Sequence, residues 1–162
     1  MDQELINNSS EVAWTLLSNA IGNYFGMGLN HQGQKYEGHC CLKREIPTKL
    51  IAVTSQAKGI NGEVFHNEIS WIGRDISGAL TLYVNSNNHP GITPHVFDRV
   101  DEGQDGSRKV VFRFGKLSDK HTFREEVTFG IHTNYNIEHT YAWGLPGGSF
   151  ETRSSARMKK IV

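Results

Sequence analysis

The sequence has 162 residues, a length typical of one ordinary domain with a core of its own. Its 17 lysines and arginines balance its 17 aspartates and glutamates, so the formal net charge is zero. A neutral chain produces no long-range field that would attract it to nucleic acid or to an anionic membrane. We therefore expect no nucleic-acid partner.

The N-terminal residues lack the basic and apolar segments of a secretory signal, and no apolar run is long enough to cross a bilayer. These features predict a protein without a membrane span and with a cytoplasmic location. We expect residues 1–162 to form a single domain. The sequence leaves the oligomeric state open.

A single helix is predicted near the start of the chain, over about residues 9–21. Asn8 and Glu11 have the spacing of a capping box, and apolar residues recur at helical intervals from Val12 to Ile21. Gly22 follows the last of these apolar residues and is a natural end for the helix.

The rest of the chain, about residues 23–160, changes to short runs of alternating polarity separated by turn residues. About ten runs are present, at residues 23–29, 35–46, 49–58, 63–73, 79–85, 93–100, 109–117, 122–132, 136–143 and 149–160. Such short links join antiparallel neighbours, and closing the meander removes its two exposed edges. The prediction is an all-β fold, an up-and-down antiparallel barrel of about ten strands with one N-terminal helix. A two-sheet sandwich is the alternative.

Strand alternation also predicts which side chains face inward. In the run 122–132, Val127 and Phe129 share an apolar face, so Arg124 and Glu126 are expected outside. Arg153 is likewise expected outside. In the run 63–73 both faces mix polar and apolar residues, and alternation does not choose between them.

A barrel of ten strands is wide enough to enclose a ligand cavity, whereas eight strands are about filled by their own side chains. Aromatic and polar residues at candidate inward positions are therefore predicted to bind a ligand; they are Tyr24, His66, Glu68, Arg74, Phe112, Arg113, Phe114, Phe129, His139, Tyr141 and Trp143. His95 and Glu125 are further candidate polar groups. Arg74 or Arg113 would anchor an acidic head group, because a buried carboxylate needs a charge partner.

Three local patterns add a family resemblance. They are the glycine-spaced stretch 22–28, the His-x-Glu pattern within 65–68, and the closing segment 143–158 with its Pro-Gly-Gly turn. Together they resemble the calycin superfamily of lipocalin-like barrels, and within it the nitrobindin-like proteins and related uncharacterised lipocalin-like domains. The resemblance implies a ligand-binding barrel. The alternate glycines also have a structural explanation, since an opening barrel strand must bend sharply.

Nitrobindin-like proteins bind haem through a histidine close to the C-terminus. The last histidine here is His139, and the final strand has none, so the sequence departs from that pattern. No cofactor is predicted, and haem is kept as an alternative with His139 as its axial ligand.

No motif in the sequence identifies a metal site or a familiar enzyme. The eight histidines show no metal-ligand spacing, and no nucleophile elbow, P-loop or dinucleotide fingerprint occurs. The leading hypothesis is non-catalytic binding or transport of a small hydrophobic molecule, such as a fatty acid. One alternative is a small isomerase, cyclase or lyase that uses His66 or His139 with Glu68 or Glu125 as an acid/base pair. Another is an interaction module whose barrel is filled by side chains.

Overall fold

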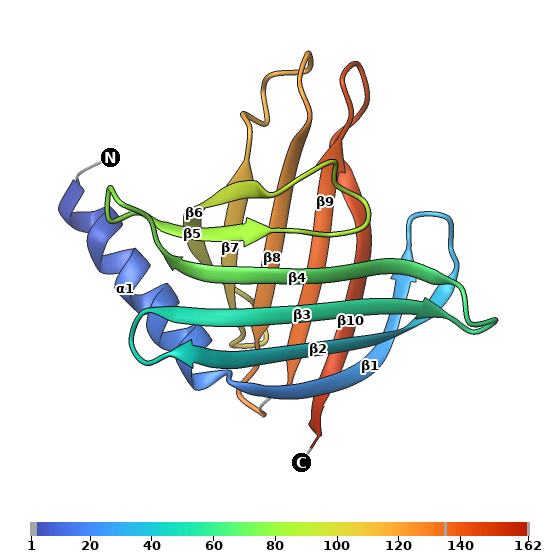
Figure 1. Cartoon of the computed structure of the whole chain (residues 1–162), viewed down its shortest axis with the longest axis horizontal. Helices are drawn as coiled ribbons and strands as arrows, with labels where there is room; N and C mark the ends of the chain where they lie inside the picture. The colour runs from blue at the N-terminus through green and yellow to red at the C-terminus, as the bar shows by residue number, and fades with distance from the viewer. Residues whose placement is uncertain (1–2, 135, 162) are drawn as a thin grey trace.

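The computed structural model describes residues 3–134 and 136–161, and within them the chain forms one helix followed by ten strands (Figure 1). The elements are α1 (Gln3–Asn19), β1 (Gly22–Asn30), β2 (Lys35–Ile46), β3 (Leu50–Gly59), β4 (Val64–Arg74), β5 (Leu80–Val84), β6 (Thr93–Glu102), β7 (Arg108–Phe114), β8 (Arg124–Ile131), β9 (Ile137–Gly144) and β10 (Glu151–Ile161).

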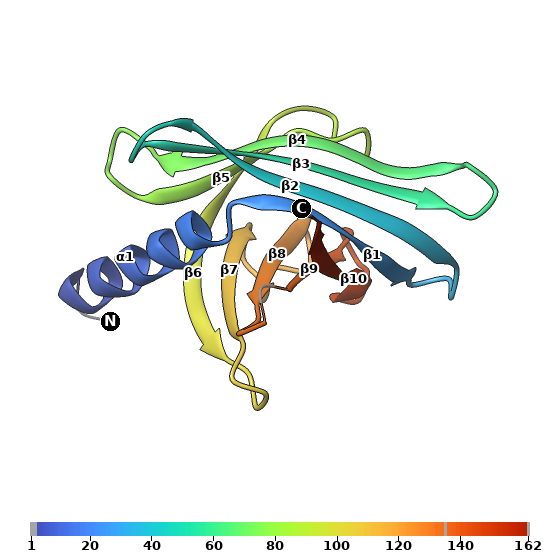
Figure 2. The same cartoon turned by 90° about the horizontal axis from the view of Figure 1, so that it is seen from below.

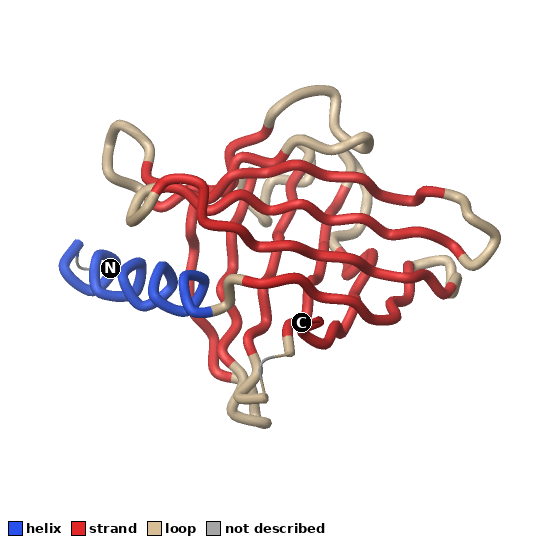
Figure 3. Tube along the Cα trace, turned by 60° about the horizontal axis from the view of Figure 1, so that its bottom comes forward, coloured by secondary structure: helices blue, strands red, loops and turns tan. Residues whose placement is uncertain are grey.

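The strands form a closed antiparallel barrel in which each strand pairs with its neighbours along the chain and β1 pairs with β10. Figure 3 shows how the strands wind around one interior. The predicted fold class is therefore confirmed, and the sandwich alternative is wrong. Predicted and observed strands differ by at most three residues at an end, the largest difference being at the end of β7. There Gly115 has a φ of 75°, which breaks the extended conformation.

The helix differs from its prediction. It begins at Gln3, so Asn8 lies inside the helix and does not cap it. Residues 3–5 are of types with good helix propensity, and this propensity extends the helix beyond the weak capping signal. The C-terminal end is at Asn19, two residues before the predicted end.

The helix packs at one end of the barrel, beside the β2–β3 and β4–β5 turns (Figures 1 and 2). Ala13 and Leu17 are fully buried and belong to the same apolar cluster as Leu42, Ile72 and Phe112 of the barrel. That end of the interior is therefore filled by side chains. In the described part of the chain, no helix has the length and apolar character needed to cross a membrane.

Five loops gather at the opposite end, namely β1–β2, β3–β4, β5–β6, β7–β8 and β9–β10. They share one end because successive strands of an up-and-down barrel alternate in direction. This loop end carries a cavity.

Strand alternation predicts most inward faces correctly. Val127 and Phe129 of β8 are buried, and β4, which alternation left undecided, turns Glu68, Ser70 and Ile72 inward. Arg124 is a correction, because its side chain is only 1% exposed although it lies on the predicted outer face. The β9–β10 loop covers it: its guanidinium donates hydrogen bonds to the carbonyl oxygens of Thr122, Leu145 and Gly148.

Candidate functional site: a cavity with two buried carboxylates

The cavity at the loop end has a volume of about 590 Å³, within the usual range of small-molecule pockets. It is lined by Asn30, His31, Gln32, Gln34, Ala57, Glu63, Val64, Phe65, His66, Asn87, Asn88, His89, Phe123, Glu125, Tyr141, Trp143, Leu145, Arg153 and Ser154. Aromatic, aliphatic and hydrogen-bonding side chains therefore border one space. The filled barrel of the interaction-module alternative does not describe this end of the molecule.

Two of the lining residues are placed there by β-bulges. Between β3 and β4 the register shifts so that Ala57 pairs with His66 and Lys58 with Val64, leaving Phe65 as the extra residue. A second shift, between Thr152 and Ser154, leaves Arg153 as the extra residue of β10. A bulge redirects the side chain that it inserts. Phe65 and Arg153 line the cavity for this reason, and the expectation that Arg153 lies outside is wrong.

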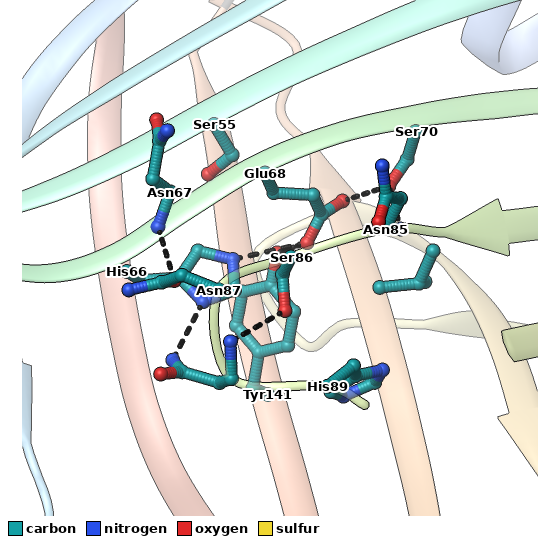
Figure 4. A network of polar contacts seen from close by, with 12 residues as sticks. Ser55, His66, Asn67, Glu68, Ser70, Asn85, Ser86, Asn87, His89 and Tyr141 are labelled. Atoms are coloured by element: carbon teal, nitrogen blue, oxygen red, sulfur yellow. Dashed lines mark hydrogen bonds and ion pairs between the residues drawn. The ribbon is translucent and has the colours of Figure 1, made fainter. Parts of the chain in front are cut away.

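Glu68 of β4 is the centre of one polar cluster, on the inner wall (Figure 4). Its carboxylate is 1% exposed and accepts three hydrogen bonds. His66 Nε2 is 3.0 Å from Oε2, the Tyr141 hydroxyl donates to the same oxygen at 2.6 Å, and the Ser70 hydroxyl donates to Oε1 at 2.6 Å. Three donors thus replace the water that burial removes.

These contacts decide the charge of the cluster. Burial by itself raises the pKa of Glu68, but the hydrogen bonds from His66 and Ser70, with the positive charge of His66 when it is protonated, outweigh burial and hold this pKa at about 2. Burial, together with the nearby Glu68 charge, raises the pKa of Tyr141 well above its ordinary value. Glu68 is therefore an anion at neutral pH, and Tyr141 keeps its proton as a donor.

The orientation of His66 is set from both sides. Nδ2 of Asn88, in the β5–β6 loop, is 3.1 Å from His66 Nδ1 and also donates to the carbonyl oxygen of Phe65. An amide nitrogen only donates, so His66 Nδ1 accepts and Nε2–H donates to Glu68. Both ring nitrogens of His66 are thereby occupied.

Glu125 of β8 is the centre of a second cluster, on the wall nearer the β5–β6 loop. Its carboxylate is 2% exposed, and its Oε2 lies 3.1 Å from His89 Nε2 and 2.7 Å from His95 Nε2. Outer partners orient both rings: His95 Nδ1 faces the carbonyl oxygen of Thr93 at 3.2 Å, and His89 Nδ1 faces its hydroxyl at 2.7 Å. Two imidazoles therefore converge on one carboxylate oxygen.

In the contact between His89 and Glu125, each residue favours the charged form of the other. The hydrogen bond to Glu125 raises the pKa of His89 in spite of burial. Burial raises the pKa of Glu125, but the hydrogen bonds from His89 and His95 outweigh it and lower this pKa below its ordinary value. Glu125 is accordingly held as a carboxylate inside the protein.

His139 of β9 lies beside the first cluster but does not line the cavity. It is 3% exposed, stacks on Phe129 with ring centroids 4.6 Å apart, and has Ser55 Oγ 3.4 Å from its Nδ1. Its Nε2 is buried, without a hydrogen-bond partner among the described residues. Burial lowers the pKa of His139 to about 4, so the ring is neutral at pH 7.

The structure brings together part of the predicted ligand set. His66, Tyr141, Trp143 and Glu125 line the cavity, and Glu68 bonds to two of them. Of the two histidines proposed as acid/base residues, His66 meets Glu68 within hydrogen-bonding distance, whereas His139 contacts Ser55.

The other predicted residues lie elsewhere. Arg74 is exposed and pairs with Glu11 of α1 at 2.5 Å, and Arg113 pairs with Glu126 and Asp98 on the outer wall. The prediction that either arginine anchors a ligand inside the barrel is therefore corrected: Arg113 has outward parity on β7, and Arg74 is the last residue of β4, at the helix end.

Several predicted aromatic residues belong to the packed core and not to the cavity wall. Tyr24 donates a hydrogen bond to the carbonyl oxygen of Ala20, beside the helix. Phe112 and Phe129 pack edge to face in the filled interior. Phe114 is intermediate: it packs against His95 and Phe123, behind the second cluster.

Sequence reasoning missed His89, Asn88, Phe65 and Arg153. The first two lie in a loop, where strand alternation carries no information, and the other two are bulge residues. The signal available was the polar, histidine-containing segment 85–89, which is richer in side-chain hydrogen-bonding groups than a plain turn requires.

The site's geometry favours neither a metal ion nor haem. Among the described residues, no three histidine, cysteine, aspartate or glutamate side chains are grouped to hold a metal ion. His139 does not fit the role of haem ligand either. It borders a void of about 20 Å³, large enough for one water molecule, and does not border the 590 Å³ cavity.

Comparisons with known proteins support the architecture. No family model matches the sequence, and no curated protein matches it. Among solved structures, the chain is similar to the crystal structure of Rv2717c from M. tuberculosis, with a TM-score of 0.71 and 12% sequence identity, over 93% of this chain and 98% of that chain. At this identity the likeness shows the fold alone, a closed antiparallel β-barrel.

Proposed function

We propose that this protein binds a small, partly apolar molecule in the loop-end cavity without transforming it. The observation that carries the proposal is the cavity itself: about 590 Å³, bordered by Phe65, Phe123, Trp143 and Leu145 and backed by buried polar groups. Pockets of this size with apolar walls and a few oriented polar groups are typical ligand sites. The calycin-like barrel is compatible with this role, although the fold does not specify a ligand.

The lining refines the hydrophobic ligand expected from the sequence. Apolar side chains border the cavity on several sides, yet Glu125, His89 and Tyr141 also border it. A wholly apolar ligand would cover these polar groups without replacing their water, which is unfavourable. We therefore infer an amphipathic ligand.

The cluster around Glu68 supports a binding role, because the hydrogen-bonding positions of its histidine are already occupied. A general base needs a free lone pair facing the substrate, and both nitrogens of His66 are already engaged by Glu68 and Asn88. The second candidate function, an enzyme using an acid/base pair, is favoured by one observation, the 3.0 Å contact between His66 and Glu68 in the protein interior.

Tryptophan fluorescence tests the binding proposal, because Trp143 borders the cavity whereas Trp14 and Trp71 do not. Small-molecule extracts of the expression host would be titrated into the native chain and into Trp143→Phe. We expect a saturable change of emission in the native chain and none from Trp14 and Trp71 in the variant. Equal responses in the two proteins, or no response, would overturn the proposal.

Native mass spectrometry separates binding from catalysis. A ligand that leaves the protein with unchanged mass after prolonged incubation supports the binding role. Conversion of the captured molecule, lost on His66→Gln, would instead establish the enzyme.

A further inference from the structure

One oxygen of the Glu125 carboxylate accepts no hydrogen bond from the described part of the protein. Both imidazole contacts, from His89 and His95, are made to Oε2. Among residues 3–134 and 136–161, no hydrogen-bond donor reaches Oε1. Oε1 is not completely buried, and Glu125 borders the cavity.

We propose that Glu125 Oε1 is the anchor of the cavity, and that the ligand presents to it a hydrogen-bond donor, an O–H or N–H group, on an apolar body. This inference rests on the proposed function and names the ligand class. A carboxylate oxygen only accepts hydrogen bonds, and a bond to a charged acceptor is stronger than a neutral one. The fixed position of Oε2 between His89 and His95 also fixes the direction of Oε1.

The same arrangement disfavours acidic ligands. Fatty acids would bring a second carboxylate toward Glu125, with the Glu68 carboxylate also in the interior. The arginines once expected to offset that charge, Arg74 and Arg113, lie outside. Like charges brought together in a buried site are strongly unfavourable.

Among the described residues of the cavity lining, the one arginine or lysine is Arg153, and its guanidinium already has partners. Its guanidinium lies 4.5 Å from the centre of the Trp143 ring. It also donates hydrogen bonds to the backbone carbonyls of Trp143 and Ser149 and pairs with Glu151. Arg153 therefore serves the β9–β10 hairpin, and an incoming anion would have to compete with these partners.

Four probes of matched shape test the inference: 4-ethylphenol, 4-ethylbenzylamine, 4-ethyltoluene and 4-ethylbenzoate. Affinities for the full-length chain would be measured at pH 7 by NMR titration. We expect the phenol and the amine to bind about tenfold more tightly than the toluene, the amount that about 1.4 kcal/mol of hydrogen bonding contributes, and the benzoate to bind most weakly.

Matched variants locate the effect. Glu125→Gln should bring the phenol and the toluene to within about twofold of each other. Glu126→Gln is the control, because this adjacent carboxylate faces outward to Arg99 and Arg113, and it should leave the affinities unchanged. The ranking of probes on the native chain remains decisive if Glu125→Gln fails to fold.

The outcomes separate this inference from the proposed function. Equal binding of phenol and toluene, or tightest binding of benzoate, would overturn the Glu125 anchor while leaving a ligand-binding cavity. Stoichiometric Zn²⁺ binding that His89→Gln and Glu125→Gln both abolish would overturn the anchor as well, by making the cluster a metal site. Binding of none of the four probes would overturn both proposals.

Discussion

The Tyr141 hydroxyl on β9 donates a 2.6 Å hydrogen bond to Glu68 on β4, 73 residues away in the sequence. This contact crosses the interior and joins two walls of the barrel that are not neighbours in the sheet. It also places the phenol ring at the cavity and the carboxylate behind it. One hydrogen-bond network, with residues on β4 and on β9, thus forms the inner wall of the cavity.

Tyr141→Phe should destabilise the protein by about 1–3 kcal/mol at pH 7, because it removes one donor from a buried, ionised carboxylate. Tyr83→Phe is the control, since Tyr83 lies on β5 at an outward-facing position of the strand pattern. Urea unfolding measures both changes. Equal stability of Tyr141→Phe and the native protein would mean that the hydrogen bond contributes nothing.

Glu68 should make stability sensitive to strong acid. Its pKa in the folded protein is about 2, against an ordinary value of 4.5, so its contribution is fully present above pH 4.5 and is lost as pH falls toward 2. The loss is about 3 kcal/mol. Denaturant unfolding from pH 5 to pH 2 should show that the stability of Glu68→Gln starts lower and falls less with pH than that of the native protein. Parallel loss of stability in the two proteins would contradict the low pKa of Glu68.

His139 should make stability depend on pH in a higher pH range than Glu68 does. Burial lowers its pKa from 6.5 to about 4, so the unfolded chain takes up a proton before the folded protein does. Stability contributed by the neutral ring is present above pH 6.5 and is lost as pH falls to about 4, by about 3 kcal/mol. His139→Phe, which keeps an aromatic ring against Phe129, should remove this slope. Persistence of the same slope between pH 6.5 and 4 would show that another group causes it.

Arg124→Lys should loosen the β9–β10 loop beside the cavity. The lysine keeps the charge but not the fork that reaches the carbonyl oxygens of Leu145 and Gly148. We expect a loss of about 2–3 kcal/mol and faster amide exchange around residues 145–148. Arg44→Lys, at an exposed site, is the control for the chemical change. Native-like exchange in this loop would contradict the role given to Arg124.

Gly26→Ala tests the opening strand. A Cβ at Gly26 would lie 2.1 Å from the carbonyl oxygen of Arg157 and 2.7 Å from Cα of Met158, so the β1–β10 closure would have to open. We expect destabilisation of at least about 2 kcal/mol, as for other severe overpacking. Gly91→Ala meets nothing within 4 Å and should be nearly neutral. Similar melting temperatures for the two variants would show that the closure tolerates a side chain.

The sequence by itself determined the barrel. Alternating runs joined by short links permit only antiparallel neighbours, and ten such runs must close to avoid exposed edges. The same alternation places Val127 and Phe129 inside, because the period of a strand is independent of its partners. Residue chemistry also selected His66, Glu68 and Glu125 as candidate interior groups.

Only the tertiary structure decided which candidates meet. Bulges insert Phe65 and Arg153 into the wall by shifting register against a partner strand, and a single sequence run does not reveal its partner's register. The β5–β6 loop brings His89 to Glu125 although nothing in its own pattern aims it there. The cavity and its free carboxylate oxygen therefore depend on contacts between distant segments, whereas the barrel follows from periodicity within each one.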